Sequence, residues 1–102
     1  MARLVALYKT PADPTAFAVC YPSTHLPPAR TIPGLTGYDI SLGPVAGMGG
    51  PSGLHRVATL HFALMADIAA AMASPQGQAT AADLANFASG GVEVMMFEEV
   101  GV

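Results

Sequence analysis

Two parts of this 102-residue chain follow one plan, in which an extended run, a helical pattern and a second extended run succeed one another. The first part comprises residues 3–9, 13–24 and 36–42, and the second comprises residues 54–62, 64–87 and 92–99. The order strand, helix, strand, strand, helix, strand is that of the split βαβ, ferredoxin-like domain. The sequence therefore predicts an α+β fold with a four-stranded antiparallel sheet that carries its helices on one face.

In the first part, the run from Arg3 to Lys9 is rich in Val, Leu and Tyr and predicts a strand, and Thr10-Pro11 ends the run because proline cannot donate to a sheet. Asp13 with Pro14 predicts the start of a helix. Pro27 would clash with a continuing helix, so the chain either kinks near His25 or begins a new helix at Pro27.

In the second part, alternation over residues 54–62 predicts a strand that pairs with residues 36–42 in a long hairpin, across a glycine-rich loop. Leu64, Ile68 and Met72 recur every four residues and predict a helix that Ser74-Pro75 stops. Thr80 to Asp83 has the capping-box pattern, which predicts that a short helix begins there.

Composition limits the functions open to the chain. Only 11% of residues are charged and the net charge is −3, which excludes the basic surface of a nucleic-acid-binding protein. A single cysteine, Cys20, excludes an internal disulfide and is compatible with the cytoplasm. No apolar run is long enough for a signal-peptide core or a membrane span. The sheet face without helices needs cover, and a homodimer is the simplest way to supply it.

A series of local motifs, in order, resembles a known family. They are Leu7-Tyr8-Lys9, Asp13-Pro14 with Phe17, Thr24-His25-Leu26-Pro27, Ile32-Pro33-Gly34-Leu35 with Tyr38, Ala73-Ser74-Pro75-Gln76-Gly77, Ala81 to Asp83 with Phe87, and Met96-Phe97-Glu98-Glu99. No single motif is specific, but their order and spacing resemble the EthD family of the dimeric α+β barrel superfamily. The resemblance covers nearly the whole chain and implies one domain over residues 1–102.

The resemblance also implies a range of functions. The family is named for a member required in the bacterial degradation of fuel ethers, alongside an ether-cleaving monooxygenase system. Related barrels are cofactor-free isomerases, cyclases, dehydratases and monooxygenases that act on small aromatic or lactone-like molecules. They use a His or a Tyr in a pocket between sheet and helices. Fold alone does not choose among these activities.

His25 is the candidate catalytic residue, because an imidazole titrates near neutral pH and lies here at a predicted bend. The alternative is a structural histidine that hydrogen-bonds backbone groups freed by Pro27. Tyr21 lies one helical turn before His25, and Tyr38 could reach the same pocket from its strand. Each tyrosine could instead serve packing alone.

Two further side chains are candidates for ligand binding. His61 is the second histidine candidate, and its alternative is a buried or interfacial structural role on its strand. Arg30 could bind a carboxylate or an enolate product, or be a solvated surface residue. His55 follows the glycine-rich loop and is expected to be exposed. The three histidines have no metal-ligand spacing, so we expect no metal and no cofactor.

These features predict a small cytoplasmic accessory enzyme, without a cofactor, in which His25 moves a proton on a small apolar or aromatic metabolite. Isomerisation, ring closure and dehydration are the reaction types that fit. The competing hypothesis is a non-catalytic protein that binds or stabilises a hydrophobic product for a monooxygenase system. A catalyst needs a titratable group facing a vacant pocket, whereas a binding protein needs only the pocket.

Overall fold

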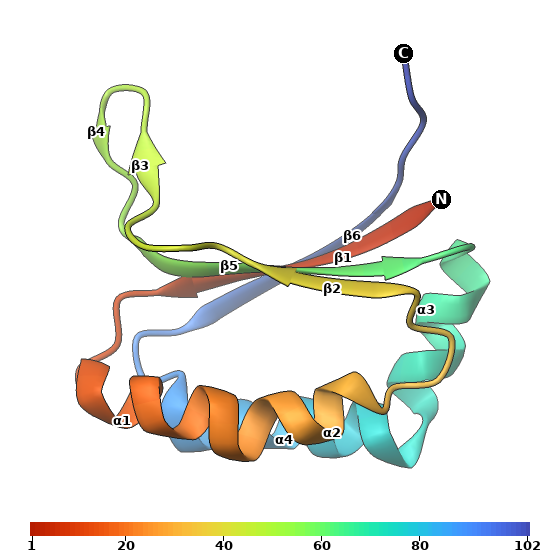
Figure 1. Cartoon of the computed structure of the whole chain (residues 1–102), viewed down its shortest axis with the longest axis horizontal. Coiled ribbons are helices and arrows are strands. Elements are labelled where there is room, and N and C mark those ends of the chain that lie inside the picture. The colour runs from red at the N-terminus through yellow and green to blue at the C-terminus, as the bar shows by residue number, and fades with distance from the viewer.

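The computed structural model describes residues 1–102 and confirms the predicted architecture, a four-stranded antiparallel sheet with helices on one side (Figure 1). The strands are β1 (Ala2–Lys9), β2 (Gly37–Ile40), β5 (Leu54–Phe62) and β6 (Val92–Glu98). Their order across the sheet is β2-β5-β1-β6, so β1 and β5 are central and β2 and β6 are the edges. This is the order expected of a ferredoxin-like domain, in which the two halves interlock.

The two faces of the sheet differ because side chains alternate along each strand. On β1, Leu4, Ala6 and Tyr8 are buried against the helices, whereas Val5 and Leu7 point the other way and are half-buried. We call the side away from the helices the open face. The open-face residues used below are Val5, Leu7, Val57, Thr59, His61 and Met95.

The first helical segment is one nearly continuous helical rod with a wide turn at its centre. It comprises α1 (Pro14–Cys20), the π-helical turn η1 (Tyr21–His25) and α2 (Leu26–Arg30). Asp13 caps α1 as predicted, since its Oδ1 accepts a hydrogen bond from the Ala16 amide at 3.0 Å. The amide of Leu26 donates to the carbonyl of Tyr21, five residues back, so the chain passes the proline-rich segment by widening one turn.

The second helical segment consists of α3 (Met65–Ala73) and α4 (Pro75–Phe87). The end of α3 at Ser74 confirms the predicted stop. The prediction that a short helix begins at Thr80 is wrong, because α4 already begins at Pro75 and Thr80 lies inside it. Ser74 is the actual N-cap, its Oγ accepting from the Gly77 amide at 3.0 Å, and Pro75 occupies the first helical position, where no amide hydrogen is needed.

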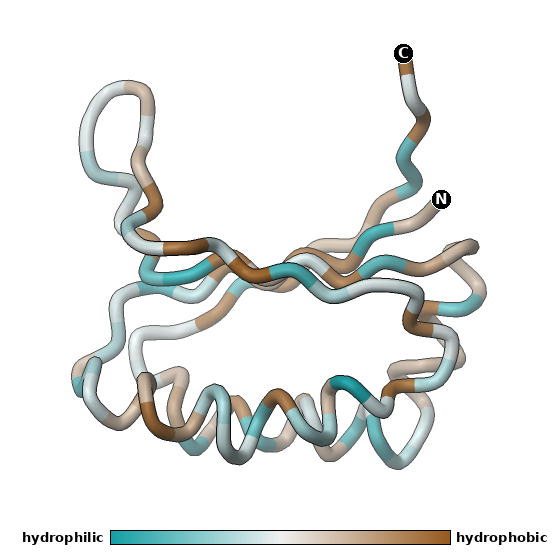
Figure 2. Tube along the Cα trace, in the orientation of Figure 1, coloured by the Kyte–Doolittle hydropathy of each residue, from teal (hydrophilic) through white to brown (hydrophobic).

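The glycine-rich loop forms a small hairpin of β3 (Ala46–Gly47) and β4 (Gly50–Pro51). This hairpin and the C-terminal segment both rise on the open side of the sheet, one at each end of the molecule (Figure 1). Figure 2 shows hydrophobic residues recurring along the strands and on the helices. The open face therefore lies between two projecting segments.

Aromatic rings fill one end of the space between sheet and helices. Four of these aromatic residues are buried, namely Tyr8, Phe17, Tyr21 and Phe87. The centroids of their rings are 5.2–5.9 Å apart in each pair. Edge-to-face packing dominates, as expected for neighbouring aromatic side chains. No helix of this fold has the length and apolar character that crossing a membrane requires. The aromatic cluster surrounds the end of η1, where His25 lies.

Candidate functional site

His25 is the last residue of η1 and is only 3% exposed. Its Nδ1 lies 3.2 Å from Oδ2 of Asp83 on α4, and its Nε2 lies 3.4 Å from the hydroxyl oxygen of Tyr8 on β1. Both ring nitrogens thus have a polar partner, one from the helical layer and one from the sheet. We call these three residues the Asp83–His25–Tyr8 chain.

The chemistry of the three groups fixes where the protons lie. The carboxylate of Asp83 can only accept, so Nδ1 of His25 carries the proton and donates it to Asp83. Nε2 then has a lone pair, and the Tyr8 hydroxyl donates to it. In this tautomer Nε2 is the ring nitrogen whose lone pair can accept a proton.

Burial sets the charge states of His25 and Tyr8. It lowers the pKa of His25 below the ordinary value of 6.5, and the hydrogen bond and negative charge of Asp83 oppose that shift only in part. Burial also raises the pKa of Tyr8 far above the ordinary phenol value of 10.0. At neutral pH the Asp83–His25–Tyr8 chain therefore contains a neutral imidazole and a protonated phenol.

A cavity lies beside the Asp83–His25–Tyr8 chain, between the sheet and the helices. Ten of its thirteen lining residues are hydrophobic, and its volume is about 80 Å³. The lining residues with polar side-chain groups are His25, Tyr8, Tyr38 and Thr80 of α4. All four strands contribute to the lining, through Tyr38 of β2, Leu60 of β5, Leu4, Ala6 and Tyr8 of β1, and Val94 of β6. The arrangement presents a base and a hydroxyl donor to an otherwise apolar space.

Tyr21 and Tyr38 form a second polar contact beside the cavity. Their hydroxyl oxygens are 2.9 Å apart, which joins η1 to the edge strand β2. Tyr38 lines the cavity, whereas Tyr21 is fully buried behind it and stacks near His25, with ring centroids 5.3 Å apart. Burial raises the pKa of both phenols, so both remain protonated at neutral pH.

The remaining two predicted ligand-binding residues do not line the cavity. His61 points to the open face, where its Nε2 lies 2.5 Å from Oδ2 of Asp39 on β2. Its neighbours Leu60 and Phe62 are buried on the helical side, so the alternation of β5 separates His61 from His25. Arg30 is exposed at the end of α2, although its positive charge acts on Tyr38 and opposes the rise in the pKa of that phenol.

Sequence reasoning missed two residues of the Asp83–His25–Tyr8 chain, namely Tyr8 and Asp83. Tyr8 has a usable signal, because the alternation of β1 places it on the same face as buried Leu4 and Ala6. Asp83 lies in the capping-box pattern that predicts a helix start, and nothing near it in the sequence points to His25, 58 residues earlier. His55, expected to be exposed, is half-buried with its ring centroid 4.7 Å from that of Phe17.

A metal centre finds no support in the side-chain arrangement. No three His, Cys, Asp or Glu side chains lie close enough together to hold a metal ion. Cys20, the single cysteine, has a free thiol and no hydrogen-bond partner among the basic residues. The polar groups at the cavity are instead an imidazole and phenols, which bind and transfer protons.

Known proteins resemble this chain over almost its whole length. An uncharacterised 11.0 kDa protein from the thcB-thcC intergenic region of Rhodococcus erythropolis is 40% identical over 100 residues, which are 97% of this chain and 95% of that protein. The crystal structure of an ethyl tert-butyl ether D (EthD) family protein from Bacillus halodurans matches with a TM-score of 0.87 and 31% identity, over 98% of this chain and 99% of that one.

A more distant structure shows the same fold. A dimeric ferredoxin-like protein of unknown function from Thermobifida fusca has a TM-score of 0.69 at 14% identity, over 94% of this chain and 88% of that one. The family model of the EthD domain matches residues 9–91, which include Asp13, His25 and Asp83. With that match and the two relatives above 30% identity, the chain belongs to the EthD family.

Proposed function

We propose that this protein is a small enzyme that needs no cofactor and uses His25 to move a proton on a compact apolar or aromatic metabolite. The observation that carries the proposal is the Asp83–His25–Tyr8 chain, which meets the wall of an apolar cavity. A neutral imidazole whose Nδ1–H is held by a carboxylate is oriented for proton transfer at Nε2.

The reaction we propose begins at a carbon next to a carbonyl group. Nε2 of His25 removes a proton from that carbon, and negative charge develops on the carbonyl oxygen. The contact of 3.4 Å between Tyr8 and Nε2 is long, so the Tyr8 hydroxyl can turn and donate to that oxygen instead. Asp83 stabilises the imidazolium that forms.

The same imidazolium then completes the reaction by returning its proton. Return to a different carbon isomerises the molecule, and transfer to a departing hydroxyl group completes a dehydration with release of water. Both outcomes leave His25 neutral, as it began. The enzyme therefore needs neither a redox partner nor an external acid for either reaction type.

A binding function is the second candidate, and the cavity lining favours it. Ten of thirteen lining residues are hydrophobic, so the cavity would hold a hydrophobic molecule even if no proton moved. In that case the protein would hold a product for another enzyme, such as a monooxygenase that degrades ethers. His25 would then only hydrogen-bond the ligand or stabilise the helical layer.

Proton exchange in D₂O distinguishes the two candidates without knowledge of the natural substrate. Small aromatic and alicyclic ketones serve as probes, and NMR follows both their binding and the loss of the α-proton signal. We expect the protein to accelerate exchange of a ketone that binds, and we expect His25→Gln to lower that rate by roughly 10²–10⁴-fold while the ketone still binds.

His61→Gln is the matched control, because His61 lies on the open face and hydrogen-bonds Asp39. Its exchange rate should equal that of the unmodified protein. Binding of ketones with no acceleration of exchange, or an equal rate in His25→Gln, would contradict the catalytic proposal and favour the binding protein.

We also propose that the protein works as a homodimer joined through its open face. The open face carries half-buried Val5, Leu7 and Val57 in neighbouring positions on the two central strands. Each apolar side chain that a second copy covers contributes favourably to association. The Thermobifida fusca protein of similar fold is dimeric, which supports this arrangement. The free thiol of Cys20 supports a place in the reducing cytoplasm.

A further inference from the structure

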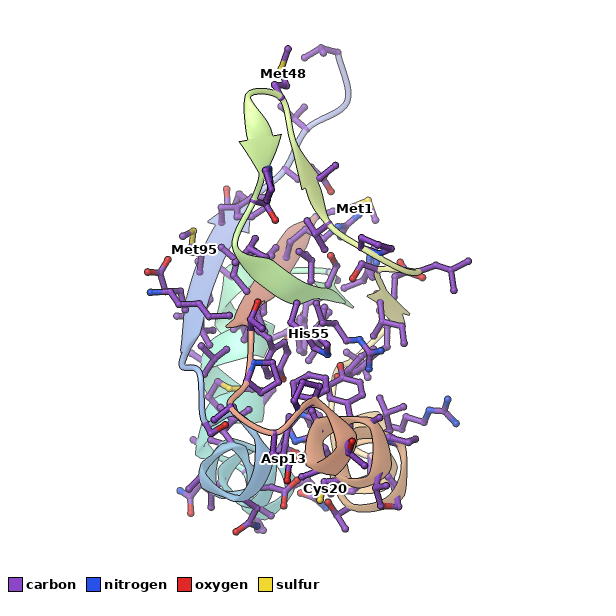
Figure 3. All side chains as sticks on the ribbon, turned by 90° about the vertical axis from the view of Figure 1, so that its left-hand side faces the viewer. Met1, Asp13, Cys20, Met48, His55 and Met95 are labelled. Carbon is purple, nitrogen blue, oxygen red and sulfur yellow. The ribbon has the colours of Figure 1, made fainter.

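A second site lies at the other side of the aromatic cluster, around His55 and Arg56 at the start of β5. Consecutive residues on a strand normally point to opposite faces of a sheet. Here Tyr8 pairs with Arg56 but Lys9 pairs with Leu54, so His55 is the extra residue of a β-bulge. Arg56 pairs with Tyr8 and lies on the helical side by the regular alternation of β5. The bulge brings His55 (labelled in Figure 3) to the same side, where its ring centroid lies 4.7 Å from that of Phe17.

Aromatic rings hold the guanidinium group of Arg56. The rings of Phe17 and Tyr21 are nearly parallel, with 8° between their planes and 5.4 Å between their centroids. The central carbon of the Arg56 guanidinium lies 5.3 Å from the centroid of Phe17 and 4.7 Å from that of Tyr21. These are cation–π contacts, which do not use the N–H donors of the group as hydrogen bonds.

No acidic group in the chain pairs with this cation. Arg3 pairs with Glu99 and Lys9 pairs with Glu93, whereas half-buried Arg56 has neither an ion-pair nor a side-chain hydrogen-bond partner. His55 also lacks a hydrogen-bond partner, and its ring lies edge-on to Phe17. His55 and Arg56 both line a shallow hollow, together with Gly43, Pro44 and Leu54.

We propose that this hollow binds the carboxylate group of a small organic acid. The edge of a guanidinium group presents two parallel N–H donors that match the two oxygens of a carboxylate, and a ring N–H of His55 supplies a further donor. Pro44 and Leu54 then contact the apolar body of the acid. The site is separate from the cavity at His25, because the two share no lining residue.

NMR titration of the ¹⁵N-labelled protein with benzoate at constant ionic strength tests the proposal. We expect saturable shifts of the backbone amides of Gly43, Leu54, His55 and Arg56, and no such shifts with benzamide, the neutral analogue. Arg56→Met should weaken benzoate binding by about tenfold or more, and Arg56→Lys, which keeps the charge but loses the paired donors, should also weaken it.

Arg30→Met is the matched control, because Arg30 is exposed on α2 and does not line the hollow. Equal weakening in this control, equal binding of benzamide, or shifts confined to the cavity residues Gly77 and Ala81 would overturn the proposal. If Arg56→Met does not fold, the side-chain Nε signal of Arg56 in the unmodified protein decides. Its failure to shift on addition of benzoate would also overturn the proposal.

Discussion

Oδ2 of Asp83 lies 3.2 Å from Nδ1 of His25, and this contact joins the two helical segments across 58 residues of sequence. Figure 1 shows α2 and α4 side by side beneath the sheet, which is what allows a residue of α4 to reach the end of η1. The wide turn of η1 ends at His25 and places its ring beside Phe87, with centroids 4.9 Å apart. The imidazole is therefore held by packing on one side and by a carboxylate on the other.

Asp83→Asn should lower the pKa of His25 further. Burial already lowers this pKa from 6.5, and the carboxylate is the group that raises it. The amide of asparagine keeps the size of the side chain but removes the negative charge. Titration of the His25 Cε1–H signal by NMR measures the change, with the unmodified protein as reference. A pKa that is unchanged or higher in Asp83→Asn would show that Asp83 does not stabilise the imidazolium.

The lowered pKa of His25 also makes folding depend on pH. Below its ordinary pKa of 6.5, an unfolded chain takes up a proton at His25 that the folded protein resists. Stability due to the neutral buried imidazole is thus fully present above pH 6.5 and is lost as pH falls through the lower, folded-state pKa. Melting temperatures between pH 7.5 and pH 5 should fall, and His25→Gln should reduce that fall. An equal slope in His25→Gln would contradict the assignment.

The sequence contained enough information for the strands and for two helix starts. The Val, Leu and Tyr content of β1 and the alternation along β5 predict both strands within a residue or two. Asp13-Pro14 and Ser74-Pro75 both pair a capping side chain with a proline that suits the first helical position. These are local signals that depend on neighbouring residues only.

The features that build the two sites depend instead on contacts between distant residues. The partner of His25 is set by how closely α4 packs beside α2, and no local pattern records that distance. The side on which His55 lies is set by a bulge in the pairing of β5 with β1, so simple alternation misplaces it. Such features become visible only when the register and the packing of the elements are known.

Gly77→Ala should destabilise the protein strongly. A Cβ at this position would lie 2.0 Å from the carbonyl oxygen of Ala71, which is backbone and cannot move aside. The joint between α3 and α4 would have to open, at a cost of about 1–3 kcal/mol or more in the free energy of unfolding. Gln78→Ala, one residue later and exposed, is the control and should change stability by less than about 0.5 kcal/mol. Urea denaturation of both variants gives the comparison, and equal stability would disprove the close approach of the two helices.

Val5→Asp should convert the proposed dimer to a monomer. Val5 pairs with Thr59 on one side and Met95 on the other, so it lies at the centre of the open face. A charge buried there without a partner opposes association by several kcal/mol, which corresponds to a dissociation constant raised by roughly 100-fold or more. Val19→Asp is the matched control, because Val19 is 61% exposed on α1, and its assembly should not change. Sedimentation velocity at micromolar concentration measures both variants. A folded monomer in the unmodified protein would contradict the dimer, because the apolar side chains of the open face would then need some other cover.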